Sequence, residues 1–311
     1  MKPFILGTRA SPLAMAQAHL TRAALTAAFP ELEVEFKAFT TRGDKKLDLN
    51  LLKKSEAGGK GLFTKELEDA LLAGSIDVAV HSLKDLPGHN PAGLQLTAVL
   101  QRAPTADALI TREVADFDAL PLGAAVGTSS IRRARQIRWL RPDVAIEEWR
   151  GNVQTRLRKL GESPRVAGIV LAQAGLERLG FDLSAGYLEF ESWKFRVSSL
   201  AGHLLPAIGQ GAIALQSVSA RPEISSVLAA LNHEPTMVCI RAERALQCLL
   251  SGDCSLPVGV RTQLEGEVLG MRAILFGEES QPPLRAEALG RRSAPEALAA
   301  EIFAQLQGAG H

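Results

Sequence analysis

Short apolar segments alternate with segments of helical periodicity at the start of this chain, and this alternation narrows the possible folds more than any other feature. Buried strands are predicted at residues 4–8 (FILGT) and 76–82 (IDVAVHS), and an alternating strand at residues 34–41 (VEFKAFTT). Helical periodicity is found at residues 11–29 and 64–75. The order strand, helix, strand, helix, strand implies a mostly parallel sheet with helices on both faces.

The alternation begins again near residue 99. Strands are predicted at residues 106–112 and 165–173, a helix at residues 131–141, and a further strand at residues 212–218 that could return to the first sheet. The last part of the chain has the pattern of antiparallel strands and helices. We therefore predict two α/β domains followed by a small α+β domain. The predicted domains are residues 1–98 with 198–219, residues 99–197, and residues 220–311.

The charge balance excludes an overall attraction to nucleic acid or to anionic membranes. The chain has 311 residues, of which 35 are basic and 34 acidic, so its formal net charge is only +1. Residues 197–220 carry no charge, but Pro206, Gly209 and Gly211 argue against a membrane span there. No secretory signal is recognised at the amino terminus. We expect a cytoplasmic protein.

Five arginines are concentrated in the segment VGTSSIRRARQIRWLR, residues 126–141. On a helical wheel they surround the predicted helix, whereas a nucleic-acid-binding helix would carry them in one stripe. Arg132 and Arg133 fall in the first turn, where the helix dipole disfavours cations. Their placement makes sense if an anion binds there, together with the backbone and hydroxyl groups of GTSS, including Ser130.

Other cations also follow predicted strands. Arg9, Lys84, Arg150, Arg156 and Arg178 each lie at or shortly after the end of a strand. Ligands of open α/β sheets bind beyond the carboxyl ends of the strands, so these side chains are expected to converge in one cleft. Arginine pairs bidentately with carboxylates, so the cleft would suit a ligand with several carboxylates. For any single arginine, a solvated or surface-paired side chain is the alternative interpretation.

One acid and one cysteine stand out. Asp85 follows Lys84 after a buried strand; it either forms an ion pair or turn cap, or is a functional carboxylate held ionised by neighbouring cations. Cys254 lies in the loop SGDCSLPVG and is a candidate nucleophile, whereas Cys239 and Cys248 fall within a helical pattern. Neither a disulfide framework nor a metal site is expected from the cysteine spacing.

The segment from Arg42 to Gly61 is polar and rich in glycine and lysine. This composition is typical of a surface loop. We expect it to be weakly ordered without a ligand and to cover the cleft when the cleft is occupied.

These motifs together resemble the porphobilinogen deaminase family, also called hydroxymethylbilane synthases. The matching segments keep the family's order and extend over nearly the whole chain. They are TRASPLA (8–14), TRGD (41–44), GGKGLFTKELE (58–68), VHSLKDLP (80–87), VGTSSIRR (126–133), RGNVQTRL (150–157), LAQAGLERLG (171–180), LPAIGQGA (205–212) and GDCSLPVG (252–259).

The resemblance implies that the first two domains are similar to type II periplasmic binding proteins. It implies an enzyme of tetrapyrrole biosynthesis that joins four porphobilinogen molecules, with loss of ammonia at each addition. It implies hydrolytic release of the linear product, hydroxymethylbilane. It also implies a dipyrromethane cofactor joined to Cys254 by a thioether.

The resemblance assigns roles to individual residues. Asp85 would be the catalytic carboxylate. The cofactor would be bound by Lys84, Asp85, Ser130, Arg132, Arg133 and Arg150, and the substrate by Arg9, Ser11, Arg150, Arg156 and Arg178. Glu56 and Asp253 depart from the family's pattern, which often has lysine at the first position and usually has glycine at the second.

Two rival classes of protein predict other features. A solute-binding protein on the same scaffold would need a secretory signal and no loop containing Cys254. A nucleic-acid-binding protein would need net basicity and a striped helix. The sequence has none of these, and we expect a monomeric enzyme with a small-molecule substrate and no nucleic-acid or membrane partner.

Overall fold

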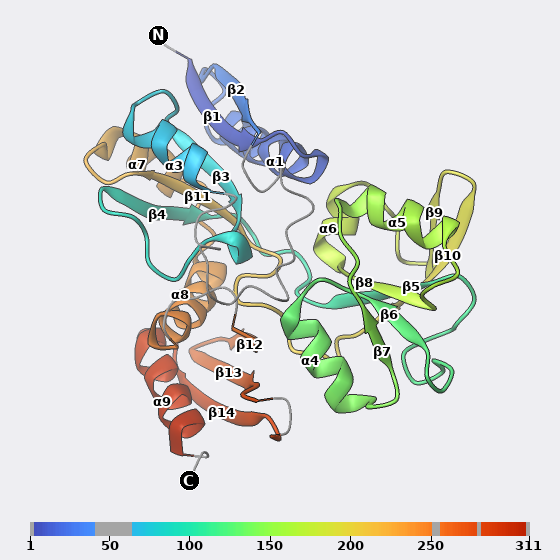
Figure 1. Cartoon of the computed structure of the whole chain (residues 1–311). Helices are drawn as coiled ribbons and strands as arrows, with labels where there is room; N and C mark the ends of the chain where they lie inside the picture. Colours follow the sequence, from blue (N-terminus) through green and yellow to red (C-terminus); the bar gives the residue numbers. More distant parts are fainter. Residues whose placement is uncertain (1–2, 41–63, 251–255, 279–280, 309–311) are drawn as a thin grey trace.

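The computed structural model describes residues 3–40, 64–250, 256–278 and 281–308. Its strands form three sheets, which Figure 1 shows as separate layered units, each covered by helices. Within the described residues, no helix has both the length and the apolar character that a bilayer span requires. The α/β class predicted from the sequence is confirmed.

The first sheet has the strand order β2-β1-β3-β11-β4. Its elements are β1 (Phe4–Arg9), α1 (Pro12–Ala28), β2 (Val34–Phe39), α3 (Lys65–Leu72), β3 (Val78–Ser82), β4 (Leu94–Val99) and β11 (Ile213–Val218). Ser11 caps α1, because its side chain accepts a hydrogen bond from the amide of Ala14. β11 returns to this sheet from far along the chain, as the sequence indicated.

The second sheet has the strand order β7-β6-β8-β5-β10-β9. Its elements are β5 (Asp107–Thr111), β6 (Ala125–Gly127), α4 (Ile131–Leu140), β7 (Ala145–Glu147), α5 (Val153–Glu162), β8 (Gly168–Ala172), α6 (Gln173–Arg178), β9 (Tyr187–Phe190) and β10 (Trp193–Ser199). Leu157 of α5 and Leu176 of α6 pack in one buried cluster, while Ile137 of α4 packs in another. Helices therefore cover both faces of the sheet.

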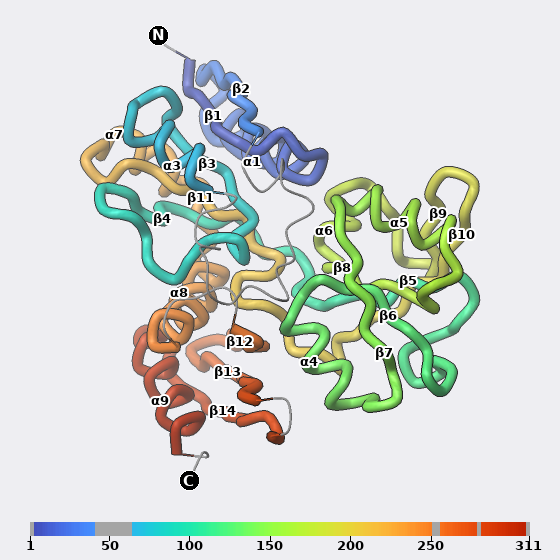
Figure 2. Tube along the Cα trace, in the orientation of Figure 1, coloured from blue at the N-terminus to red at the C-terminus, as the bar shows by residue number. Residues whose placement is uncertain are grey.

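Both large sheets are mixed rather than mostly parallel, so that part of the prediction was wrong. β1 is parallel to β2 and β3, but β11 is antiparallel to β3 and β4. β6 is parallel to β7 and β8, but β5 is antiparallel to β8 and β10. β5 and β11 are the strands that follow the two connections between the sheets, residues 100–106 and 200–212 (Figure 2). Each enters its new sheet against the direction of its neighbours.

The third sheet is an antiparallel meander in the order β12-β13-β14. Its strands are β12 (Val258–Glu265), β13 (Val268–Leu275) and β14 (Leu284–Arg291), and the helices α8 (Glu234–Leu249) and α9 (Pro295–Gly308) pack against it. The preceding helix, α7 (Pro222–Ala229), instead packs on the first sheet through Ile224 and Leu228. The domain boundaries given above stay a prediction.

One buried carboxylate joins all three sheets. Glu243 of α8 is fully buried, and its two oxygens accept hydrogen bonds from Arg102 Nη1 at 2.6 Å and Nη2 at 3.0 Å. Arg102 lies on the outgoing connection, and the amide of Gly209 on the returning connection donates to Glu243 at 2.7 Å. The hydroxyl of Thr262 on β12 donates to the same carboxylate at 2.5 Å. Glu243 therefore links the third sheet to both connections.

We expect Glu243→Ala to lower the free energy of unfolding by about 3–5 kcal/mol, because it leaves the Arg102 guanidinium buried without its counter-charge. Arg241→Ala is the matched control on the same helix. Its ion pair with Glu296 joins side chains that are 50% and 53% exposed, and it should contribute about 0–1 kcal/mol. Urea unfolding followed by circular dichroism measures the free energy of unfolding of each variant and of wild type. Equal midpoints for the two variants would contradict the role given to Glu243.

Candidate active site

The centre of the site is the turn that ends β3. A short 3₁₀ turn, Leu83–Asp85, follows Ser82 directly. Its buried Leu83 side chain packs against Gly209, and a Cβ at Gly209 would lie 2.1 Å from Leu83 Cδ2. Gly209 has φ +70°, which favours glycine independently of the lack of space. This close packing holds Lys84 and Asp85 at the carboxyl end of the strand.

Asp85 faces Arg9, which ends the neighbouring parallel strand β1. Arg9 Nη1 and Asp85 Oδ2 are 3.8 Å apart, and both side chains are partly exposed. A narrow cavity of about 10 Å³, about the size of one water molecule, is lined by both residues and by His81 of β3. Burial lowers the pKa of His81 to about 4, so its ring is neutral at pH 7. The charge of Asp85 is therefore opposed locally by arginine and not by histidine.

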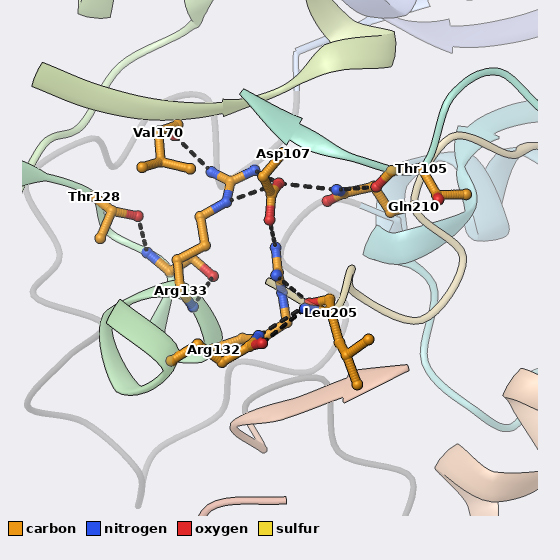
Figure 3. Close-up of polar contacts among 10 residues, drawn as sticks. Thr105, Asp107, Thr128, Arg132, Arg133, Val170, Leu205 and Gln210 are labelled. Atoms are coloured by element: carbon orange, nitrogen blue, oxygen red, sulfur yellow. Dashed lines mark hydrogen bonds and ion pairs between the residues drawn. The ribbon is translucent and has the colours of Figure 1, made fainter. Parts of the chain in front are cut away.

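Arg132 and Arg133 lie at the start of α4 and surround one acid, Asp107, the first residue of β5 (Figure 3). Ser130 caps the helix by accepting a hydrogen bond from the amide of Arg133. Arg133 Nε and Nη2 donate to Asp107 Oδ1 at 3.1 and 2.8 Å, and its Nη1 donates to the carbonyl of Val170. Arg132 Nη2 lies 2.8 Å from Asp107 Oδ2.

Asp107 is ionised in this setting. Burial raises the pKa of its carboxyl, but Arg132, Arg133 and a hydrogen bond from Gln210 outweigh burial and hold the pKa well below its usual range. One carboxylate faces two guanidiniums, so a positive charge remains. Asp107 was not among the site residues predicted from the sequence. The available signal was an acid at the start of an otherwise apolar buried strand, ADALIT.

Lys84 connects the turn of the first sheet with this arginine pair. Burial and, next, the charges of Arg133 and Arg132 lower the pKa of Lys84, while Asp85 and Asp107 raise it, and together they bring it to about 8. The electrostatic coupling requires that side chains from both α/β sheets lie near one another. A common cleft for all the cations at the strand ends stays a prediction.

Three more arginines surround the same region. Burial lowers the pKa of Arg156 to about 10, with further contributions from Arg133 and Arg150. Arg150 pairs with Glu148 at 2.5 Å, and Arg156 Nε donates to the carbonyl of Gly151 at 2.8 Å. Arg178 Nη2 donates to the carbonyl of Gly211 on the returning connection at 2.6 Å, and burial lowers its pKa to about 10.

Apart from Arg178, which bonds to the returning connection, the predicted residues fall into three groups. Electrostatic coupling links Lys84, Asp85, Arg132, Arg133, Arg150 and Arg156, while Arg9 joins them through Asp85. Ser11 and Ser130 are helix caps, which is a structural role compatible with a binding role. Cys254, Asp253 and the segment Arg42–Gly61 with Glu56 lie outside the described residues. The functional roles given to all these residues stay predictions.

Among the residues that the structure describes, no group of three or more His, Cys, Asp or Glu side chains could hold a metal ion.

The depressed pKa of Lys84 has a consequence for stability. Between pH 8 and about 10.5 the unfolded chain binds a proton at Lys84 that the folded protein has lost, so stability should rise with pH across this window. We expect wild type to gain stability relative to Lys84→Met between pH 7.5 and 10.5. Urea unfolding of both proteins at these two pH values measures the difference. A difference that does not change with pH would show that Lys84 is not desolvated by the fold.

Comparison with known proteins identifies the family. The family model described as "Porphobilinogen deaminase, dipyromethane cofactor binding domain" matches residues 4–226. A porphobilinogen deaminase of Methylobacillus flagellatus is 40% identical over 98% of this chain and 94% of its own. A porphobilinogen deaminase of Syntrophobacter fumaroxidans is 43% identical over 94% of this chain and 93% of its own. A porphobilinogen deaminase of Bordetella parapertussis is 42% identical over 94% of this chain and 89% of its own.

Solved structures with a related arrangement include the methionine-binding protein MetQ. It is 12% identical, covers 73% of this chain and 88% of its own, and has a TM-score of 0.41. A likeness of this size says nothing about activity. The sequence relatives and the family model, by contrast, match most of the chain. The matched residues include the turn after β3, the start of α4 and the returning connection. The chain belongs to the porphobilinogen deaminase family.

Proposed function

We propose that the chain is a hydroxymethylbilane synthase, a transferase that joins four porphobilinogen molecules head to tail with loss of ammonia. Hydrolysis then releases the linear tetrapyrrole hydroxymethylbilane. The observation that carries the proposal is the meeting of Lys84, Asp85 and the arginine pair Arg132 and Arg133 in one cluster with more cations than acids. Such a cluster suits a substrate that carries carboxylates and develops positive charge as it reacts.

The family's dipyrromethane cofactor fits the donor groups that are present. Each of its pyrroles carries an acetate and a propionate, and guanidinium and ammonium groups bind such carboxylates well. Arg132 Nε is buried and has no hydrogen-bond partner within the described residues, so the cluster still has donor capacity. The residues that would hold the cofactor are Lys84, Asp85, Ser130, Arg132, Arg133 and Arg150, with Cys254 forming the thioether. When bound, the cofactor supplies the pyrrole carbon to which the first substrate is joined.

Asp85 would stabilise the charge that forms on the substrate. The protonated amino group leaves as ammonia when the C–N bond of the aminomethyl arm breaks, and the positive charge left on the methylene carbon spreads into the pyrrole ring and to its N–H. A fixed carboxylate beside that N–H lowers the energy of the charged state. Arg9, 3.8 Å from Asp85, is placed to orient the carboxylate. The same group can serve deamination and coupling at every addition.

The arginines would position the substrate. Arg9, Ser11, Arg150, Arg156 and Arg178 are the candidates for binding the acetate and propionate groups of porphobilinogen. The lowered pKa values of Arg156 and Arg178 reflect burial, and a bound carboxylate would compensate for the lost hydration. These contacts would place the aminomethyl carbon near the nucleophilic pyrrole carbon, which removes much of the entropic barrier.

The proposal extends to the setting of the enzyme. We include in it a monomeric, cytoplasmic protein that acts on a small molecule without nucleic acid or membrane. The support is the near-neutral charge of the chain, with 35 basic and 34 acidic residues.

We expect Asp85→Asn to lower the rate of ammonia release by about 10²–10³, because it removes one preorganised charge. Asp85→Glu keeps the charge and should retain more activity than Asp85→Asn. Substrate binding should survive in both variants, since the arginines hold the carboxylates. Single-turnover ammonia release by enzyme that carries its cofactor measures the effect. Release at the wild-type rate from Asp85→Asn would place the catalytic group elsewhere.

A second test concerns the attachment of the cofactor. We expect the intact mass of purified protein to exceed the sequence mass by a covalent dipyrrole, and Cys254→Ser to lose this increment. Cys248→Ser and Cys239→Ser should keep it, because both lie within α8. An unmodified mass in active wild-type protein would rule out the covalent cofactor.

A further inference from the structure

A second hollow lies away from the candidate active site, between α4 and the third sheet. Its volume is about 490 Å³, and none of the residues predicted for the active site lines it. Figure 1 shows α4 of the second sheet beside the meander of β12, β13 and β14. Hollows of roughly 300–1,000 Å³ at the junction of two domains are the usual sites of small ligands. We call this hollow the α4 groove.

The wall of the α4 groove is held in place by hydrogen bonds. Gln136 and Leu205 line it and are joined twice, by Gln136 Nε2 to the Leu205 carbonyl at 2.9 Å and by the Leu205 amide to Gln136 Oε1 at 2.8 Å. Arg135 tethers α4 to the third sheet by donating to the carbonyls of Gly277 and Glu278 at 2.7 and 2.8 Å. The groove is therefore formed before any ligand enters.

One side of the groove offers a flat apolar surface. Trp139, in the last turn of α4, is 43% exposed, and its neighbour Leu140 is also exposed. Trp149, by contrast, is buried in the core of the second sheet. Ile274 of β13 contributes a further apolar contact from the third sheet. An exposed tryptophan beside aliphatic side chains suits an aromatic ring that stacks on it.

The other side of the groove is cationic. Its charged residues are Arg272, Arg285 and Glu287, and Arg272 Nε is bonded to Glu287 Oε1 at 2.6 Å. Among the described residues, the side chain of Arg285 has no ion pair or hydrogen bond. One positive charge is thus left at the edge of an aromatic and aliphatic wall. This combination matches a ligand with a flat ring and an acidic group.

We propose that the α4 groove is a binding site for flat organic anions, such as aromatic carboxylates or sulfonates. The ring stacks on Trp139, and the acidic group pairs with Arg285. None of the residues to which a catalytic or binding role is assigned lines the groove, although Arg132 donates to the Leu205 carbonyl in its wall at 2.6 Å. The proposed ligand does not depend on the proposed function.

The probe for the test is 1-anilinonaphthalene-8-sulfonate, an aromatic sulfonate whose fluorescence rises on binding. We expect it to bind the holoenzyme at one site that excess porphobilinogen does not displace. Trp139→Ala should weaken its affinity about tenfold. Arg285→Ala should weaken it about threefold to fivefold, as for an exposed charge pair. Trp139→Phe keeps an aromatic ring and should restore most of the affinity.

Two controls use the same kinds of side chain outside the groove. Leu122→Ala removes an 88% exposed apolar side chain, and Arg291→Ala removes an exposed arginine at the other end of β14. Neither should change the affinity for the probe. Affinities unchanged in both Trp139→Ala and Arg285→Ala would overturn the site, as would displacement of the probe by porphobilinogen. Because Trp139 and Arg285 are exposed, unfolding midpoints close to wild type should accompany the loss of binding.

Discussion

The arrangement of the three sheets depends on the pairing of Glu243 with Arg102. A fully buried carboxylate is tolerated only when its oxygens are hydrogen-bonded and its charge is balanced. Arg102, the Gly209 amide and the Thr262 hydroxyl meet these needs from three different parts of the chain. Gly209 also packs against Leu83 in the turn that holds Lys84 and Asp85. Gly209 therefore contacts both the Glu243 carboxylate and the turn that carries the candidate catalytic acid.

A second buried acid, Asp107, performs a comparable task inside the site. Arg132 and Arg133 stand at the start of a helix, where the dipole disfavours their charges, and both are buried. Asp107 offsets one of these charges, and its two oxygens hold both guanidiniums in place. Gln210, on the returning connection, orients Asp107 by donating a hydrogen bond to it. The arginines are therefore preorganised, and a ligand carboxylate would not have to supply the whole of their counter-charge.

The sequence predicted the positions of strands well, including the return of β11 to the first sheet, but not the direction of every strand. Alternating apolar and helical segments placed the strands, and the cations after them indicated a common cleft. The direction of β5 and β11 could not be predicted, because it depends on how the connections at residues 100–106 and 200–212 cross between the sheets. Asp107 was missed because it precedes Arg133 by 26 residues, and an apolar strand gives no sign of which helix faces its first residue.

The lowered pKa values of Lys84 and Arg156 lead to one further conclusion. In each case burial is the largest cause, and neighbouring arginines increase the effect. A fold under selection for stability alone would separate these cations or pair each of them with an acid. Here Asp107 is shared between two arginines, and the charges of both arginines also act on Lys84. Groups held in such unfavourable surroundings are typical of functional sites. The charge left unbalanced in the cluster is thus itself evidence for an anionic ligand, independent of the family to which the chain belongs.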